Sequence, residues 1–269
     1  MPDRPTHLVT GANAGIGFEI VRGLAATGAH VVMACRDLAK AEAARAVLLK
    51  DAPGASLEIL HVDLASQASI RAAAASFTER HPTLDVLVNN AAAVSQTRKT
   101  TADGIELTFA TNVLGYHLLT SLLRPLLERA SPGGARIVNV ASMMASDLDL
   151  RDVEWKRRRY DPSSAYAQSK QANRMLTWAL ARRLEGTGVT ANAMHPGAVD
   201  TALLHALIPG MRGRSTSQGA ETGIYLATSA DVAGVSGRFW SDLREVPCRF
   251  RGEAEEEALW TLCDRMTGL

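Results

Sequence analysis

The sequence predicts one α/β domain, a doubly wound parallel sheet with helices on both faces. Two observations support this fold class. Short β-type runs alternate with longer helical stretches through most of the 269 residues, and no repeat or linker divides them. The strand-like runs are apolar throughout instead of alternating apolar with polar residues, which is typical of parallel strands buried on both faces.

The first half of the chain contains three strand–helix pairs. We expect strands at residues 7–10, 30–34 and 57–62. Each is followed by a stretch of helical composition, and these helices are expected at residues 15–27, 38–49 and 66–80. The second helix is rich in Ala, Lys and Glu and the third in Ala, which are strong helix formers.

The second half continues the alternation. Strands are expected at 86–89 and 136–140, with a long helical region ending near residue 128 between them. The later elements are a helix at 163–184, a strand at 190–194, a helix at 217–229, a strand at 237–240 and a helix at 255–266. Residues 1–269 are therefore predicted to form a single domain.

Two segments interrupt this rhythm. Residues 146–161 are polar, and residues 199–216 contain Pro209, Gly210 and Gly213 with little periodicity. Both follow the carboxyl ends of strands, where doubly wound sheets bind their ligands. We therefore expect both to be loops on the substrate side of the domain.

Composition excludes several functional classes. A net charge of +1 gives no reason to expect nucleic acid or an anionic membrane as a partner. No apolar run approaches the ~18 residues that would suggest a membrane span, and the first strand begins too early for a signal peptide. Cys35, Cys248 and Cys263 are an odd number without a CxxC pair, which indicates reduced thiols. We expect a cytoplasmic protein without membrane insertion.

A glycine-rich run from Thr10 to Gly17 follows the first predicted strand and begins the first helix. Glycines at Gly11, Gly15 and Gly17 let the backbone turn tightly, and the helix offers free N–H groups at its positive end. The alternative is an ordinary tight turn. Its position between a strand and a helix of a βαβ unit favours binding of a dinucleotide pyrophosphate.

The end of the second strand is expected to meet the adenosine ribose. NAD sites usually place a carboxylate there, whereas an arginine suits the 2′-phosphate of NADP. Here Cys35 is followed by Arg36 and Asp37, which favours NADP(H). Two alternatives stay open: Asp37 turns to the ribose and selects NAD(H), or Arg36 is a surface charge and Asp37 caps the next helix.

Tyr166 and Lys170 are four residues apart on a predicted helix, so their side chains share one face. An ammonium beside a phenol is expected to lower the tyrosine pKa. Ser142, at the end of a strand, could hold a substrate oxygen beside the tyrosine. The alternative for the pair alone is a packed aromatic next to a solvated lysine.

These motifs together resemble the short-chain dehydrogenase/reductase family over nearly the whole chain. The motifs are Thr10-Gly11-x-x-x-Gly15-x-Gly17, Asp63-Leu64, Asn89-Asn90-Ala91-Ala92, Asn112, Ser142, Tyr166-x-x-x-Lys170 and His195-Pro196-Gly197. The stretches 35–37, 181–184 and 259–263 are most similar to the branch of retinol dehydrogenases and their bacterial relatives. One departure is Ala92, where the family usually has glycine. The resemblance therefore does not determine the shape of the pocket beside this residue.

The resemblance implies a role for each catalytic residue. Tyr166 would be the general acid/base, Ser142 would orient the substrate oxygen, and Lys170 would bind the nicotinamide ribose and lower the tyrosine pKa. Asn112 would hold a water linked to Lys170.

The resemblance also implies a set of cofactor contacts. Asp63 would contact adenine, Asn89 would support the cofactor and the sheet, and the loop after Pro196 would face the nicotinamide. The full set of expected contacts is Gly11, Asn13, Gly15, Ile16, Gly17, Arg36, Asp63, Leu64, Asn89, Ala91, Tyr166, Lys170, Pro196, Gly197 and Val199.

The sequence therefore predicts a dinucleotide-binding and catalytic domain that transfers a hydride between NADP(H) and a carbonyl or alcohol. The residues Leu203, Leu204, Leu207 and Ile208 favour a hydrophobic small molecule as substrate. A cofactor-sensing regulatory protein without turnover is the alternative, and a homo-oligomer or a subunit of a larger assembly stays open.

Two conspicuous patterns in the sequence are weak indicators of function. The basic run 156–159 is interpreted as a solvated face, with contact to an anionic substrate or carrier as the alternative. The histidines at 7, 61, 81, 117 and 195 show no metal-ligand spacing, so no metal is expected.

Overall fold

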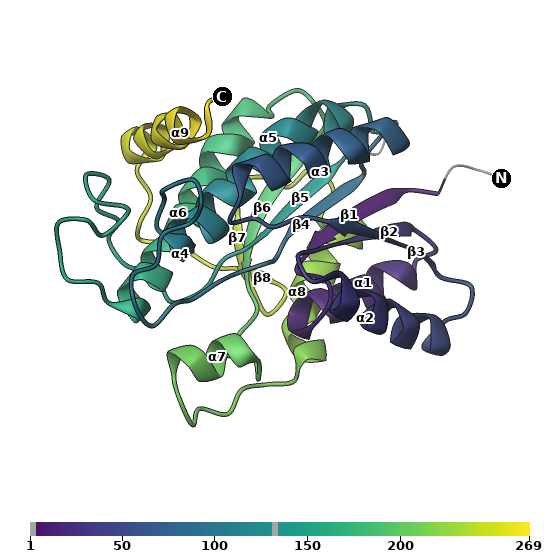
Figure 1. Ribbon diagram of the computed structural model, residues 1–269. Helices are drawn as coiled ribbons and strands as arrows, with labels where there is room; N and C mark the ends of the chain where they lie inside the picture. Colours follow the sequence, from purple (N-terminus) through teal and green to yellow (C-terminus); the bar gives the residue numbers. More distant parts are fainter. Residues whose placement is uncertain (1–3, 131–133) are drawn as a thin grey trace.

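In the computed structural model, which describes residues 4–130 and 134–269, the strands form one sheet in the order β3-β2-β1-β4-β5-β6-β7-β8 (Figure 1). Neighbours are parallel except for β7 and β8. The strands are β1 (Thr6–Thr10), β2 (His30–Cys35), β3 (Ser56–His61), β4 (Val86–Asn89), β5 (Arg136–Val140), β6 (Thr190–His195), β7 (Phe239–Ser241) and β8 (Arg244–Glu245). The predicted doubly wound α/β fold is confirmed.

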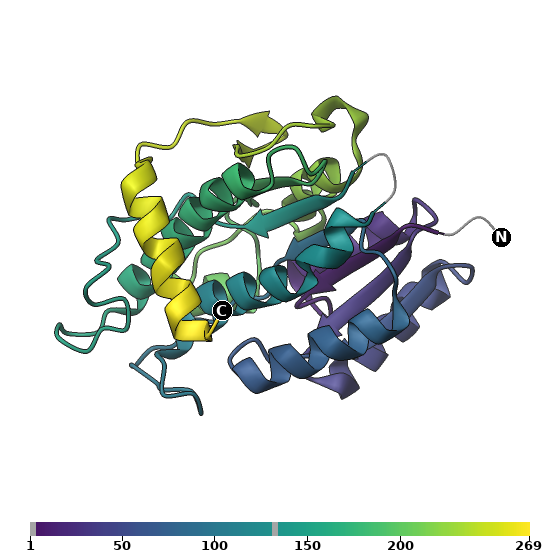
Figure 2. The same ribbon diagram turned by 90° about the horizontal axis from the view of Figure 1, so that it is seen from above.

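Helices cover both faces of the sheet because its strands are apolar on both sides. One face is covered by α1 (Gly15–Ala25), α2 (Leu38–Asp51) and α8 (Thr216–Thr228), and the other by α3 (Gln67–Arg80), α5 (Gly115–Glu128) and α6 (Pro162–Arg183). The last helix, α9 (Glu253–Thr267), packs on α6 and α5 (Figure 2).

Polar side chains at the helix starts fix where several helices begin. Asp37, Ser66 and Asp161 each accept a hydrogen bond from a free backbone N–H in the first turn of α2, α3 and α6. Ser215 and Gln218 form a reciprocal capping box at the start of α8. These caps satisfy N–H groups that have no partner inside the helix.

The long helical region before residue 128 is not one regular helix. It begins with α4 (Leu107–Phe109), continues as a π-helical turn, η1 (Ala110–Leu114), and becomes α5 at Gly115. A Cβ at Gly115 would lie 2.9 Å from Leu64, so this glycine lets the helix approach the loop after β3. The π-turn contains Asn112, and such turns are frequent at functional sites.

The predicted loop at 199–216 contains a short helix, α7 (Ala202–Leu207), which its low periodicity did not predict. Thr201 caps this helix through the N–H of Leu204. Strand β8 and the 3₁₀ turn η2 (Ala230–Val232) were also missed. Within the described residues, the helices are too short or too polar to cross a membrane.

Candidate active site

The glycine-rich turn after β1 has the backbone that the sequence predicted. Gly11 and Gly15 have φ angles of +64° and +58°, which favour glycine. A Cβ at Gly11 would lie 2.9 Å from the Cα of Ala91, and one at Gly17 would collide with the carbonyl oxygen of Gly11. Gly17 therefore packs helix α1 against the turn, while Gly11 and Gly15 line the space in front of the helix.

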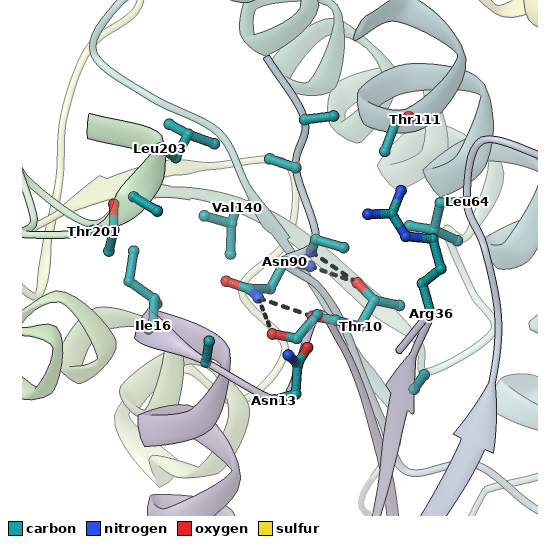
Figure 3. A pocket seen from close by; sticks show the side chains of 18 of the residues that line it. Thr10, Asn13, Ile16, Arg36, Leu64, Asn90, Thr111, Val140, Thr201 and Leu203 are labelled. Carbon is teal, nitrogen blue, oxygen red and sulfur yellow. Dashed lines mark hydrogen bonds between the residues drawn. The ribbon is translucent and has the colours of Figure 1, made fainter. Parts of the chain in front are cut away.

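Asn90 ties this turn to the end of β4 (Figure 3). Its Nδ2 donates to the Thr10 carbonyl at 2.8 Å, and the N–H groups of Asn90 and Ala91 donate to Thr10 Oγ1 at 2.8 and 3.1 Å. Asn89, which was expected at the cofactor, is fully buried and donates to Thr120 Oγ1 and Asn139 Oδ1. Adjacent strand residues point in opposite directions, so Asn90 lines the cleft and Asn89 supports the sheet.

A cleft of about 830 Å³ lies at the carboxyl ends of the strands. Arg36 lies at one side of it, and Thr201 and Leu203 lie at the other (Figure 3). The expected site residues that line the cleft are Gly11, Asn13, Gly15, Ile16, Arg36, Asp63, Leu64, Ala91, Tyr166, Lys170 and Pro196. Those that do not line it are Gly17, Asn89, Asn112, Ser142, Gly197 and Val199.

Arg36 and Asp37 have separate environments at the end of β2. Arg36 is exposed at the edge of the cleft and forms no ion pair with any described residue. The Asp37 carboxylate accepts from the Lys40 backbone N–H at 3.1 Å and lies 3.3 Å from the Lys40 ammonium. These hydrogen bonds lower the pKa of Asp37. The carboxylate is thus held as a helix cap, and the guanidinium is free to meet a ligand.

Tyr166 and Lys170 lie on α6 at the inner part of the cleft, and both are buried. Lys170 Nζ donates to the Val140 carbonyl at 2.7 Å. It lies 5.7 Å from the centre of the Tyr166 ring and 5.6 Å from that of Tyr116. Burial lowers the pKa of Lys170 to about 7, so this lysine gains and loses its proton near neutral pH.

The expected lowering of the Tyr166 pKa is wrong for the protein without ligands. Burial raises the pKa of Tyr166, and a hydrogen bond with the Ser142 hydroxyl opposes that rise only partly. The Lys170 ammonium is directed to the Val140 carbonyl and not to the phenol oxygen. Tyr166 is therefore a neutral phenol that can donate a proton.

Asn112 and Ser142 support the reacting end from behind its wall. Asn112 accepts from the Ala93 N–H at 2.7 Å and donates to the Ala93 carbonyl and to Ser169 Oγ, each at 3.0 Å. Ser142 Oγ accepts from the Met144 N–H at 3.0 Å, so its position beside Tyr166 is fixed. The π-turn in the long helical region directs the Asn112 amide to the loop after β4.

His195 and Gly197 flank Pro196, which lines the cleft, and pack behind it. His195 Nδ1 accepts from the Met143 N–H at 3.1 Å, and burial lowers the pKa of His195 to about 4. A Cβ at Gly197 would collide with the guanidinium of Arg214, which pairs with Asp242 at 2.5 Å. The turn after β6 therefore brings Pro196 to the cleft through close packing.

The basic run 156–159 is not a uniform solvated face. Arg158 lies 3.7 Å from the centre of the Trp155 ring and donates to Gln168 Oε1 at 2.8 Å. Lys156 pairs with Glu154 at 2.9 Å. Lys156, Arg157 and Arg159 are exposed, as expected of a solvated face, and within the run only Arg158 joins the 146–161 segment to α6.

A doubly wound sheet with a glycine turn, a buried Tyr/Lys pair and a cleft between them defines a dinucleotide-dependent oxidoreductase. Comparison with known proteins narrows this class. A profile of the short chain dehydrogenase family matches residues 5–211, and the chain belongs to that family.

The chain is 38% identical to human retinol dehydrogenase 13, over 98% of this chain and 85% of that protein. A crystal structure of an uncharacterised protein from Mycobacterium paratuberculosis is 33% identical, with a TM-score of 0.80 over 98% of this chain and 93% of that one. A second structure, from Beutenbergia cavernae, is described as an NAD(P)-dependent gluconate 5-dehydrogenase and contains NADP at low occupancy. It is 28% identical, with a TM-score of 0.68 over 87% and 93% of the two chains.

Proposed function

We propose that this protein interconverts a carbonyl and an alcohol on a hydrophobic small molecule with NADP(H), and that Tyr166 is the general acid/base. The observation that carries the proposal is the arrangement of one continuous cleft. The Arg36 guanidinium lies at one end without an ion pair to any described residue, and Tyr166 and Lys170 are buried at the other, with the Ser142 hydroxyl hydrogen-bonded to the Tyr166 phenol.

Two observations support the fit of a dinucleotide cofactor to this chain. The first residues of α1 and the turn before it, from Asn13 to Ile16, line the cleft, and no side chain caps the N–H groups at this helix end. Arg36 offers a planar fork that suits a 2′-phosphate, while Asp37 is held by Lys40. When bound, the cofactor would supply or accept the hydride at the substrate carbon.

Residues of this chain would carry out the proton transfer. In the direction of reduction, Tyr166 gives its hydroxyl proton to the carbonyl oxygen as the carbon gains a hydride. Ser142 donates a hydrogen bond to the same oxygen and holds it in place. Lys170 lies close enough to favour the phenolate that remains, and solvent then returns a proton. Oxidation of an alcohol is the reverse.

The substrate side favours an apolar molecule. Leu203 in α7 lines the cleft, and Ile208 just after α7 is 40% exposed. Leu204 is buried, so it packs on the domain and is not available to a ligand. Because its relative is named a retinol dehydrogenase, a long apolar aldehyde such as a retinoid belongs among the first substrates to test.

The test is a panel of aldehydes, ketones and alcohols of increasing apolar length, followed by nicotinamide absorbance with NADPH and NADH. The proposal expects turnover with at least one long apolar carbonyl and with NADPH as the better cofactor. Tight NADPH binding without oxidation across the whole panel would instead support a cofactor-sensing protein.

A further inference from the structure

Three side chains meet at the end of the sheet opposite the cleft. His30 begins β2, Glu58 lies in β3 two residues beyond the partner of His30, and His81 follows the last residue of α3. They are widely separated in the sequence, and spacing alone does not place them together. The edge strand β3 and the end of α3 bring their polar atoms to one point.

The two imidazoles converge on one carboxylate oxygen. His30 Nε2 and His81 Nε2 each lie 3.3 Å from Glu58 Oε2, and the three atoms lie within 4.8 Å of one another. Charge-assisted hydrogen bonds are usually ~2.7–2.9 Å long, so both contacts are longer than a good ion pair. Three potential ligand atoms therefore surround one small space.

His81 Nε2 has no hydrogen-bond partner among the described residues, although it is buried and directed at this space. The His81 side chain is only 12% exposed and packs against Phe77 at 4.5 Å between ring centres. A buried ring nitrogen without a partner is costly, and each such group in a folded protein needs an explanation.

The two distances between the histidine nitrogens and Glu58 Oε2 fit tetrahedral zinc. Zn–N and Zn–O bonds of ~2.0–2.2 Å place two ligands of a tetrahedral zinc about 3.3 Å apart. The supporting contacts also fit, since His30 Nδ1 lies 2.8 Å from Ser56 Oγ, which can hold the ring orientation. Arg80 binds the other oxygen, Glu58 Oε1, and leaves Oε2 to face the imidazoles.

We propose that His30, Glu58 and His81 form a structural site for a zinc-class divalent cation, with solvent as the fourth ligand. The site would connect the edge strand β3 to the end of α3, far from the cleft. The cluster offers two ring nitrogens and one carboxylate oxygen as ligands, the donor types that zinc binds. The positive charges of Arg4 and Arg80 oppose the cation, so we expect micromolar affinity.

The test uses full-length protein without a histidine tag, stripped of metal and titrated with ZnCl₂ by calorimetry. We expect one equivalent to bind, at least tenfold weaker binding in His81→Ala and Glu58→Gln, and unchanged binding in His61→Ala. His61 is the matched control because it is an exposed histidine on the same strand.

Two further readouts separate ligation from unfolding. Co²⁺ in place of Zn²⁺ should give the visible absorption of a tetrahedral site in the wild type but not in His81→Ala. Zinc should slow amide exchange in residues 56–61 of the wild type only. Absence of one-to-one zinc binding in the wild type, or equal loss in His61→Ala and His81→Ala, would overturn the site.

Discussion

The two ends of the cleft differ in how they are built. At the reacting end Tyr166 and Lys170 are buried, and desolvation shifts both of their pKa values strongly. At the adenosine end Arg36 and Asp37 lie at the surface, and contacts with Lys40 account for the pKa shift of Asp37. Burial makes an interaction both strong and costly, whereas solvent screens the exposed end. Substitutions at the two ends should therefore differ in size and kind.

The largest effect is expected at Tyr166. Tyr166→Phe removes the only proton donor in the proposed reaction and leaves the ring packing in place. Turnover should fall ~10²–10⁴-fold, because positioned proton transfer contributes about that much. The measurement is kcat with the best carbonyl of the panel, with cofactor affinity by fluorescence as the control. Near wild-type turnover in the variant would contradict the assignment.

A substitution at Lys170 tests how much the burial of its charge lowers the free energy of unfolding. Its pKa is about 7 in the folded protein and near 10.5 when unfolded, so the unfolded chain binds more protons between these values. This lysine therefore destabilises the fold at pH 7 and below, and the penalty disappears as pH rises toward 10.5.

Lys170→Met removes this penalty but also removes the hydrogen bond to Val140, which offsets part of the gain. The free energy of unfolding should therefore rise by roughly 1–3 kcal/mol at pH 7. The gain should shrink as pH rises to 10. Denaturant unfolding of both proteins without cofactor at several pH values is the measurement. A gain that grows with pH would show that burial does not control this lysine.

Arg36→Ala tests the exposed end. A charge-assisted pair with the 2′-phosphate at a solvated edge is expected to contribute ~1.5 kcal/mol, about tenfold in affinity. We expect kcat/KM with NADPH to fall about tenfold and that with NADH to change little. If the wild type prefers NADH, Asp37 and not Arg36 determines the cofactor preference by contacting the adenosine ribose.

Asp37→Ala is expected to have the smallest effect. It removes the cap of α2 and should lower stability by ~0.5–2 kcal/mol, the usual value for such a cap. The ratio of NADPH to NADH use should not change, because the carboxylate is directed to Lys40. Thermal unfolding and the two kcat/KM values measure both parts, and a large rise in NADPH preference would count against the cap assignment.

The alternation of apolar strands and helices predicted the fold, with element ends within a few residues. It could not predict the π-turn at Ala110–Leu114, whose extra residue per turn depends on tertiary packing. It also missed β8 and α7, which are too short to show a period.

At the site, the residue types and their order in the sequence predicted most of the expected groups that line the cleft. Asn89 supports the sheet as expected, but sequence reasoning did not identify Asn90 as a cleft residue, because the direction of a side chain at a strand end depends on the exact last residue. It also gave the wrong direction for the Tyr166 pKa, since spacing on a helix does not measure desolvation. Contacts between distant elements, such as His30 and His81, have no local signal.

The Asn112 amide has a mechanical consequence. It joins the loop after β4 and helix α6 to the same π-turn, so we expect these two walls of the cleft to move together. The opposite wall is held by fewer buried contacts: one exposed hydrogen bond, from Gln96 Nε2 to the Ala206 carbonyl at 2.6 Å, joins α7 to the loop after β4, and backbone hydrogen bonds of Arg214 with Ala198 and Asp200 hold its base. Thermal motion should therefore be largest in α7, which would move relative to the two walls that Asn112 joins. Amide exchange in residues 202–213, compared with and without NADPH, would measure that asymmetry.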